Sequence, residues 1–497
     1  MFEGQPKGLW ALAFANTGER FGYYTMLAVF ALFLGENFGF SAGTASEIYT
    51  WFLTLVYFLP LIGGMAADKW GYSKMVVIGI FIMFMGYLLL SVPLGGGTVA
   101  IAAMGIALLL VSFGTGLFKG NLQVMVGDLY NDPKYSQKRD AGFSLFYMLI
   151  NVGALFAPTA AIAIMDWAQA DLGYTKADSY HFAFAVACAS VIASILIYYG
   201  GMATFRHVLS AKKVKSAEEQ PVEEMSPAET KERIICLCLV FAVVIFFWMA
   251  FHQNGLTLTW FADEFTATSA SGAQAMMFDV TNLLLGIVIV FGIFNIGGAS
   301  SKGKVIWGIV MAACVALLAY KYTTVEEVSI AAPIFQQFNP CFVVALTPVS
   351  IAIFGWLAKK GKEPKAPVKI GLGMLVAAAA YLLMTLSCFG LPATDHPNHV
   401  ANVTPNLLVS TYLILTFAEL LLSPIGISFV TKVAPAKYKG MMMGGWFVAT
   451  ALGNKLVSIP GHMWDMDLTI VWGTLMCICL VAALFIFSII KKLNKVA

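Results

Sequence analysis

Six ionisable side chains lie inside long apolar stretches of this sequence, where a charge is costly. They are Glu19, Arg20, Lys119, His252, Glu419 and Lys455. Ionisable residues within a membrane usually pair with one another or line a path for a substrate or an ion. Lys119 and Glu419 carry opposite charges on segments that are far apart in the sequence. Together they would suit a ligand whose negative and positive ends are separated.

Each of the other four has a simpler interpretation beside a functional one. The adjacent Glu19 and Arg20 are expected to face a water-filled path, with a structural ion pair as the alternative. Lys455 stands near the end of its apolar stretch, and its long side chain is expected to reach the membrane interface. His252 is either a neutral, hydrogen-bonded core residue or a titrating group.

The composition defines the class of protein that must position these residues. The 497 residues are 59% hydrophobic and only 11% charged, with a mean hydropathy of +0.80. Soluble domains carry roughly 25% charged residues, so the chain is predicted to be an all-α, multi-pass membrane protein. The net charge of +3 does not indicate nucleic-acid binding. The eight cysteines show neither metal-ligand spacing nor a disulfide pattern, so no metal or cofactor is predicted. No cleavable signal peptide is expected before the first apolar stretch.

Fourteen stretches approach the roughly 20 apolar residues that a spanning helix needs. Their predicted limits are 8–34, 45–67, 75–92, 98–126, 140–165, 181–205, 233–261, 279–298, 303–321, 334–358, 369–390, 406–431, 440–462 and 468–490. Basic residues concentrate in alternate loops, which is typical of cytoplasmic loops. The opposite loops hold only Lys176 and Lys321. This asymmetry predicts fourteen crossings with both termini in the cytoplasm.

The charged, proline-containing stretch 206–232 follows the first six predicted helices. It is predicted to be a cytoplasmic linker between an N-terminal six-helix bundle at 1–205 and a C-terminal bundle at 233–497. The C-terminal part has two helices more than six. We expect the extra pair to form an inserted hairpin at about 279–321, at the periphery and facing lipid.

A series of motifs, in family order over nearly the whole chain, resembles the proton-dependent oligopeptide transporters of the major facilitator superfamily. The motifs are "ERFGYY", "LVYFLPLIGG", "GGMAADKWGYSK", "GLFKGNLQVMVGDLY", "FSLFYMLINVGALFAP", "FWMAFHQNG", "FQQFNP", "ELLLSPIGISFVTKVAP" and "MMMGGWF". The resemblance implies two six-helix bundles around a central cavity and an alternating-access cycle. Bacterial members usually insert two helices between the bundles, so a hairpin at 279–321 would be a departure.

The resemblance also implies roles for individual residues. Lys119 and Arg20 match the cations that meet the carboxylate of a peptide, and Glu419 matches the acid that meets its ammonium group. Glu19 and His252, together with those three, are the candidates for proton coupling. The cavity-lining positions are matched by Tyr23, Tyr24, Tyr57, Tyr147, Asn151, Trp248, His252, Asn339 and Trp446.

Three positions depart from the pattern of the family. Asn16 replaces the first acid of the motif Glu-x-x-Glu-Arg, Leu27 stands where an arginine is usual, and His252 stands where its acidic partner is usual. An asparagine cannot carry a proton, so Glu19, Glu419 and His252 remain as the titratable candidates.

We therefore predict a secondary active transporter that imports di- and tripeptides, coupled to protons. It is expected to act as a monomer in a bacterial inner membrane. One alternative is a relative that transports another small solute, such as nitrate or an amino-acid-like compound, although Glu419 would oppose a simple anion. A nutrient receptor that does not transport is a second alternative. An enzyme is not predicted, because the sequence has no metal-spaced histidines, Gly-x-Ser-x-Gly motif or paired intramembrane aspartates.

Overall fold

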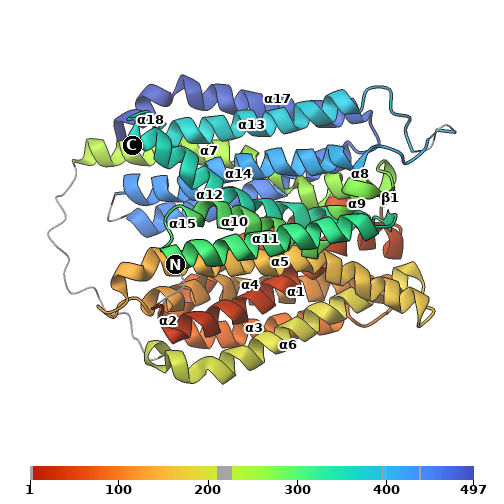
Figure 1. Cartoon of the computed structure of the whole chain (residues 1–497), viewed down its shortest axis with the longest axis horizontal. Helices are drawn as coiled ribbons and strands as arrows, with labels where there is room; N and C mark the ends of the chain where they lie inside the picture. Colours follow the sequence, from red (N-terminus) through yellow and green to blue (C-terminus); the bar gives the residue numbers. More distant parts are fainter. Residues whose placement is uncertain (1–3, 210–225, 395, 398, 436–437, 497) are drawn as a thin grey trace. The chain divides into compact units, whose positions relative to one another are not determined.

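The structure is a computed structural model that describes residues 4–209, 226–394, 396–397, 399–435 and 438–496. Nearly all of the described chain is helical, as predicted (Figure 1). The strands β1 (Ser269–Ala270) and β2 (Val328–Ser329) pair in an antiparallel two-stranded sheet. Most of the predicted linker lies outside the described residues.

The helices follow one another along the chain with short connections. Their bounds are α1 (Lys7–Phe38), α2 (Ala42–Trp70), α3 (Tyr72–Leu90), α4 (Thr98–Asp128), η1 (Ser136–Lys138), α5 (Arg139–Ala170), α6 (Lys176–Leu209), α7 (Pro227–Phe251), η2 (His252–Gly255), α8 (Thr257–Glu264), α9 (Gly272–Met276), α10 (Val280–Ile296), α11 (Ser301–Thr324), η3 (Ala332–Gln337), α12 (Phe338–Lys359), α13 (Ala366–Ser387), α14 (Pro405–Val433), α15 (Lys439–Leu456), α16 (Ser458–His462), α17 (Leu468–Ser488) and α18 (Ile490–Val496).

Each of the fourteen predicted stretches coincides with one of these helices or with consecutive ones, such as α15 and α16. Among the described residues, eleven helical segments are long and apolar enough to cross a membrane. The chain is therefore a multi-pass membrane protein. For α1, α10 and α15, which are not among those eleven, crossing stays a prediction.

Local signals set the ends of α1, α2 and α3. Gly39 ends α1 with a φ of 66°, a left-handed conformation that costs a glycine little. Ser41 begins α2, because its side chain accepts a hydrogen bond from the amide of Thr44. Gly71, with a φ of 97°, separates α2 from α3. The loops are consequently short, and the spans follow in close succession.

The described chain divides into two compact units. The first contains residues 1–252 and 430–462, and the second contains 253–429 and 463–495. The first unit thus includes α7, α15 and α16 in addition to the six N-terminal helices. The predicted bundle boundaries at 205 and 233 stay a prediction.

In the first unit, α2 packs against both α4 and α15, and α1 packs against α5 and α6. The contact between α2 and α4 is especially close at Gly63 and Gly116. A Cβ atom added at Gly63 would lie 2.1 Å from the carbonyl oxygen of Gly116. The side chain of Asn121 on α4 also donates to the carbonyl of Gly63, at 3.2 Å. Glycine at both positions therefore lets the two backbones touch.

In the second unit, α10 packs on α11 and α12, and α13 packs on α17. At Gly292 of α10, an added Cβ atom would lie 2.5 Å from the sulfur of Met311 on α11. The structure describes every residue of α11, and only Cys314 among them is buried. This exposure fits the predicted peripheral position of the hairpin, whose insertion and lipid contact stay predictions.

Candidate functional site

Glu19 and Arg20 form a bidentate ion pair in the middle of α1. The distances are 2.5 Å from Arg20 Nε to Glu19 Oε2 and 2.6 Å from Arg20 Nη2 to Glu19 Oε1. The side chain of Glu19 is 0% exposed and that of Arg20 is 3% exposed, and the guanidinium lies 4.5 Å from the ring centre of Tyr23. Both side chains are therefore buried, and a position on a water-filled path stays a prediction. The ion pair that the sequence offered as an alternative is what the structure contains.

Lys119 on α4 has a different environment. Its Nζ atom lies 4.4 Å from the ring centre of Tyr57 on α2, a cation–π contact. Arg20 and Glu19 are within electrostatic range. Among the described residues, no carboxylate lies within ion-pair distance of this half-buried ammonium group. Lys119 therefore rests on an aromatic face without a countercharge, which leaves it available to an anionic group.

His252 lies beside the same aromatic residues. Its Nδ1 atom is 2.5 Å from Oδ1 of Asn454 on α15, and because that oxygen only accepts, the imidazole donates. The ring stacks on Trp248 at 4.9 Å and lies 5.8 Å from the ring of Tyr57. The amide nitrogen of Asn454 in turn donates to the carbonyl of Leu53 on α2, at 3.5 Å. Where the family pattern has an acid paired with an arginine, this chain has an imidazole bonded to an amide.

We call Lys119, Tyr57, Trp248, His252 and Asn454 the Lys119 group. It joins α4, α2, η2 and α15 with the end of α7. Asn454 was not predicted from the sequence. A signal was present in the polar pair "NK" at 454–455 within an otherwise apolar stretch. The indole nitrogen of Trp248 is buried and has no hydrogen-bond partner among the described residues, which adds an unused donor to the group.

Glu419 lies in the second unit, on α14. Asn339 of α12 donates its amide to Glu419 Oε2 at 3.0 Å and to Thr416 Oγ1 at 3.1 Å. Among the described residues, no lysine, arginine or histidine nitrogen is within ion-pair distance of this half-buried carboxyl group. Two predicted site residues are thus in direct contact, and the acid has neutral partners only.

The other predicted site residues are buried to different degrees. Tyr23 is buried, and its ring lies 5.2 Å from that of Tyr24. Trp446 is also buried, whereas Tyr147 is 48% exposed. Asn151 bonds the carbonyl of Tyr147, one turn earlier in its own helix. Their roles in a ligand site stay predictions.

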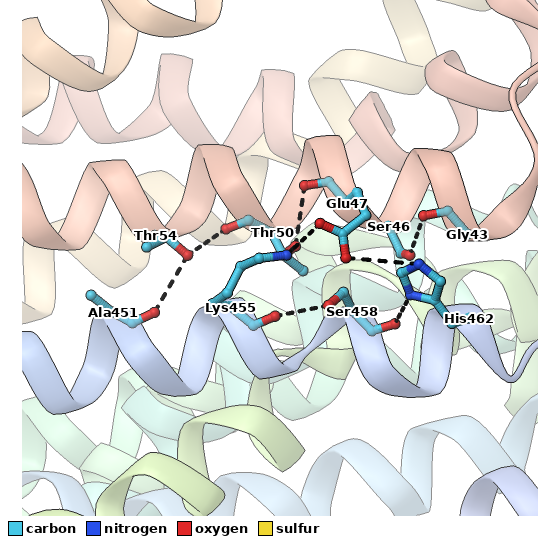
Figure 2. Close-up of polar contacts among 9 residues, drawn as sticks. All are labelled: Gly43, Ser46, Glu47, Thr50, Thr54, Ala451, Lys455, Ser458 and His462. Atoms are coloured by element: carbon cyan, nitrogen blue, oxygen red, sulfur yellow. Dashed lines mark hydrogen bonds and ion pairs between the residues drawn. The ribbon is translucent and has the colours of Figure 1, made fainter.

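Lys455 has a partner that the sequence did not predict. Its Nζ atom lies 2.5 Å from Oε2 of Glu47 on α2 (Figure 2). Its reach to a membrane interface stays a prediction. Glu47 was missed from the sequence because it stands in the first two turns of its helix, where an acid is ordinary. The two residues are 408 positions apart.

Comparison with known proteins identifies the family. The family model described as the POT family matches residues 73–220 and 321–465, together more than half of the chain. This protein belongs to the POT family.

The chain is also similar to individual relatives. An uncharacterised transporter, YclF of Bacillus subtilis (strain 168), is 29% identical over 99% of this chain and 96% of its own length. A di-/tripeptide transporter of Lactococcus lactis subsp. cremoris is 28% identical over 92% of this chain and 89% of its own. The crystal structure of a peptide transporter POT in complex with sulfate matches with a TM-score of 0.75 at 24% identity, covering 100% and 96% of the two chains. The predicted major facilitator fold is thereby confirmed.

Proposed function

We propose that this protein transports di- and tripeptides across the membrane by alternating access, driven by protons. The proposal rests on the contacts that two intramembrane charges make. Lys119 and Glu419 lie in different units, and each has neutral partners only among the described residues. A carboxylate would give Lys119 its missing countercharge, and an ammonium group would do the same for Glu419. A short peptide carries both of these groups.

Lys119 is the proposed partner of the peptide carboxylate. Arg20 is a weaker candidate, because its guanidinium is already neutralised by Glu19. Glu419 is the proposed partner of the peptide ammonium group. The aromatic side chains of the Lys119 group would form a wall that accepts varied peptide side chains.

Proton coupling is proposed to use Glu419. Its neutral partner Asn339 can remain in place whether the carboxyl group is charged or protonated, since an amide offers both a donor and an acceptor. Asn16, buried in α1, has no titratable group to contribute. His252 and Glu19 are the further candidates for carrying or sensing the proton.

The cellular setting is proposed on the same basis. The alternating distribution of basic residues supports cytoplasmic termini, and the bacterial relatives support an inner membrane. We propose a functional monomer without enzymatic activity, in keeping with a transporter family. No cofactor is required for the proposed cycle.

The test is uptake of a labelled dipeptide into proteoliposomes that contain the purified chain, with and without an inward proton gradient. Gradient-driven accumulation supports the proposal. Binding measured by a thermal shift without any uptake or counterflow would indicate a receptor instead. Uptake of nitrate or of a single amino acid, but not of dipeptides, would indicate a different solute and overturn the proposal.

A further inference from the structure

A polar cluster joins the beginning of α2 to the end of α15 and to α16. We define the Glu47 cluster as Glu47, Thr50, Lys455, Ser458 and His462, all in the first unit (Figure 2). Figure 2 shows these side chains lying between the two helical segments. The cluster is separate from the Lys119 group, and no step of the proposed function has used it.

Glu47 is the centre of the cluster. Its Oε2 atom is 2.5 Å from Lys455 Nζ, and its Oε1 atom is 3.8 Å from His462 Nε2. Lys455 also lies 3.5 Å from Oγ1 of Thr50 and 5.0 Å from the ring centre of Trp51. One carboxylate on α2 therefore meets one fixed cation and one group that becomes a cation when protonated.

The histidine is held in a defined orientation. Its Nδ1 atom lies 2.9 Å from the carbonyl oxygen of Ser458, and a carbonyl can only accept, so Nδ1 carries a hydrogen. The neutral ring must then direct the lone pair of Nε2 toward Glu47, whereas the protonated ring directs an N–H group there. The titratable and charged groups that face His462 are Glu47 from α2 and Lys455 from α15. Protonation of His462 therefore adds attraction between α16 and α2.

If α2 moves away from α15, the contacts between Glu47 on α2 and Lys455 on α15 have to break. The ion pair is partly exposed, with side-chain exposures of 25% for Lys455 and 39% for Glu47. The contact continues along α2, where Thr54 donates to the carbonyl of Ala451 at 3.4 Å. Water can reach and solvate the separated charges at this end of the helices, so the pair can open without burying an isolated charge.

We propose that the Glu47 cluster is a conformational latch, in which Glu47, Lys455 and protonated His462 hold the first turns of α2 against α15 and α16 and must separate in each cycle. The inference rests on the proposed alternating-access function. A latch of this kind sets how often the protein opens at the end of α2 that contains Glu47. Closing at this end would accompany opening at the opposite end, near Trp70 and the beginning of α15.

The test is amide hydrogen exchange, measured on the whole protein in lipid nanodiscs without peptide or gradient. Glu47→Gln and Lys455→Met are each expected to increase exchange in residues 41–54 and 451–462 by about twofold to fivefold. Exchange in residues 62–74 and 438–446 is expected to fall at the same time. The double variant Glu47→Lys with Lys455→Glu restores the pair in reverse and should return both regions toward the parent values.

A matched control is Glu36→Gln. Glu36 at the end of α1 pairs with Lys176 of α6 at 2.7 Å, in the same unit but outside the cluster. This variant is expected to leave exchange in the four segments unchanged. The latch is overturned if exchange at 41–54 is unaffected in the cluster variants or if the control has the same effect. It is also overturned if exchange rises at both ends or if the reversed pair does not restore it, because these outcomes indicate local fraying.

The contribution of His462 is tested by repeating the measurement at about pH 5.5 and pH 8, with protection factors corrected for the intrinsic pH effect. The parent protein should be more protected in 451–462 at the lower pH, and His462→Gln should lose that difference. An unchanged difference would remove His462 from the latch. Since no substrate is used, these results stand apart from the uptake assay, and a failure of peptide transport would be recognised separately.

Discussion

The Lys119 group and the Glu47 cluster both use α2 and α15, yet they treat charge in opposite ways. In the Glu47 cluster, the lysine and the carboxylate lie 2.5 Å apart and neutralise each other. In the Lys119 group, the ammonium lies on the face of Tyr57, and His252 bonds to a neutral amide. A paired charge is a good means of holding two helices together, whereas a charge with neutral neighbours still attracts a ligand. The same two helices thus combine a paired-charge contact with a candidate binding site.

The largest effect is expected from removing the charges that have neutral partners. Lys119→Ala and Glu419→Gln should each reduce dipeptide uptake in proteoliposomes by about tenfold to a hundredfold, because a charged hydrogen bond to the ligand is lost. Lys176→Gln, in the surface pair with Glu36, is the control and should transport normally. Near-parental uptake by either site variant would show that a charge with neutral neighbours is not needed to bind the ligand. The proposed difference between the Lys119 group and the Glu47 cluster would then be wrong.

The next effect concerns the packing that brings the Lys119 group together. Gly63→Ala should destabilise the protein by roughly 1–3 kcal/mol, because the new Cβ atom would lie 2.1 Å from the carbonyl oxygen of Gly116. Thermal unfolding in detergent measures the change. Gly64→Ala is the matched control, since an added Cβ atom there meets nothing within 4 Å. Equal melting temperatures for the two variants would contradict a close contact between α2 and α4.

A smaller effect is expected for the imidazole of the Lys119 group. His252→Gln keeps a donor for Asn454 but cannot take up a proton. If His252 tunes transport, the midpoint of the pH profile of gradient-driven uptake should move by about half a unit or more. A profile with the same midpoint and a lower amplitude would assign His252 to packing and hydrogen bonding alone.

The smallest effect is expected outside the two regions, at the start of α10. Burial raises the pKa of Asp279, but hydrogen bonds from Lys321 and Thr281 outweigh it, and the net pKa is below its usual value. A carboxylate with a lowered pKa stabilises the folded state above its unfolded pKa, and this stability is lost as the pH falls through the folded value.

Asp279→Asn should therefore lower the free energy of unfolding by at most about 1 kcal/mol at pH 7, because the pair is partly exposed. The difference from the parent should shrink below about pH 4. Thermal melts at both pH values measure it. A difference that persists unchanged in acid would assign the effect to the helix cap instead of the charge.

The fold was largely predictable from the sequence, and the pairing of charges was not. Apolar stretches of about 20 residues identify helices because the membrane interior leaves few other ways to satisfy the backbone. Glu19 and Arg20 illustrate the limit for neighbours. Adjacent positions on a helix point in different directions, so their pairing depends on two long side chains bending toward each other.

Lys455 and Asn454 illustrate the limit for distant residues. Their partners, Glu47 and His252, are 408 and 202 positions away, and only the packing of α2, α7 and α15 brings them together. The sequence of a single helix does not indicate which residues of other helices it contacts. The candidate site was therefore predicted as a set of residues, through a family resemblance, and its internal contacts were not.

The close contact at Gly63 and Gly116 has a mechanical consequence. With the backbones touching and Asn121 bonded across them, α2 cannot slide past α4 without breaking that fit. Tyr57 stands ten residues, or about 15 Å of helix, from Glu47. The two helices then move as one rigid body, with Lys119 near its middle and Glu47 at one end. Suppose that ligand binding at Lys119 shifts the equilibrium between the open and closed Glu47 cluster. The open and closed states of the cluster must then differ in their affinity for that ligand, because the coupling is reciprocal.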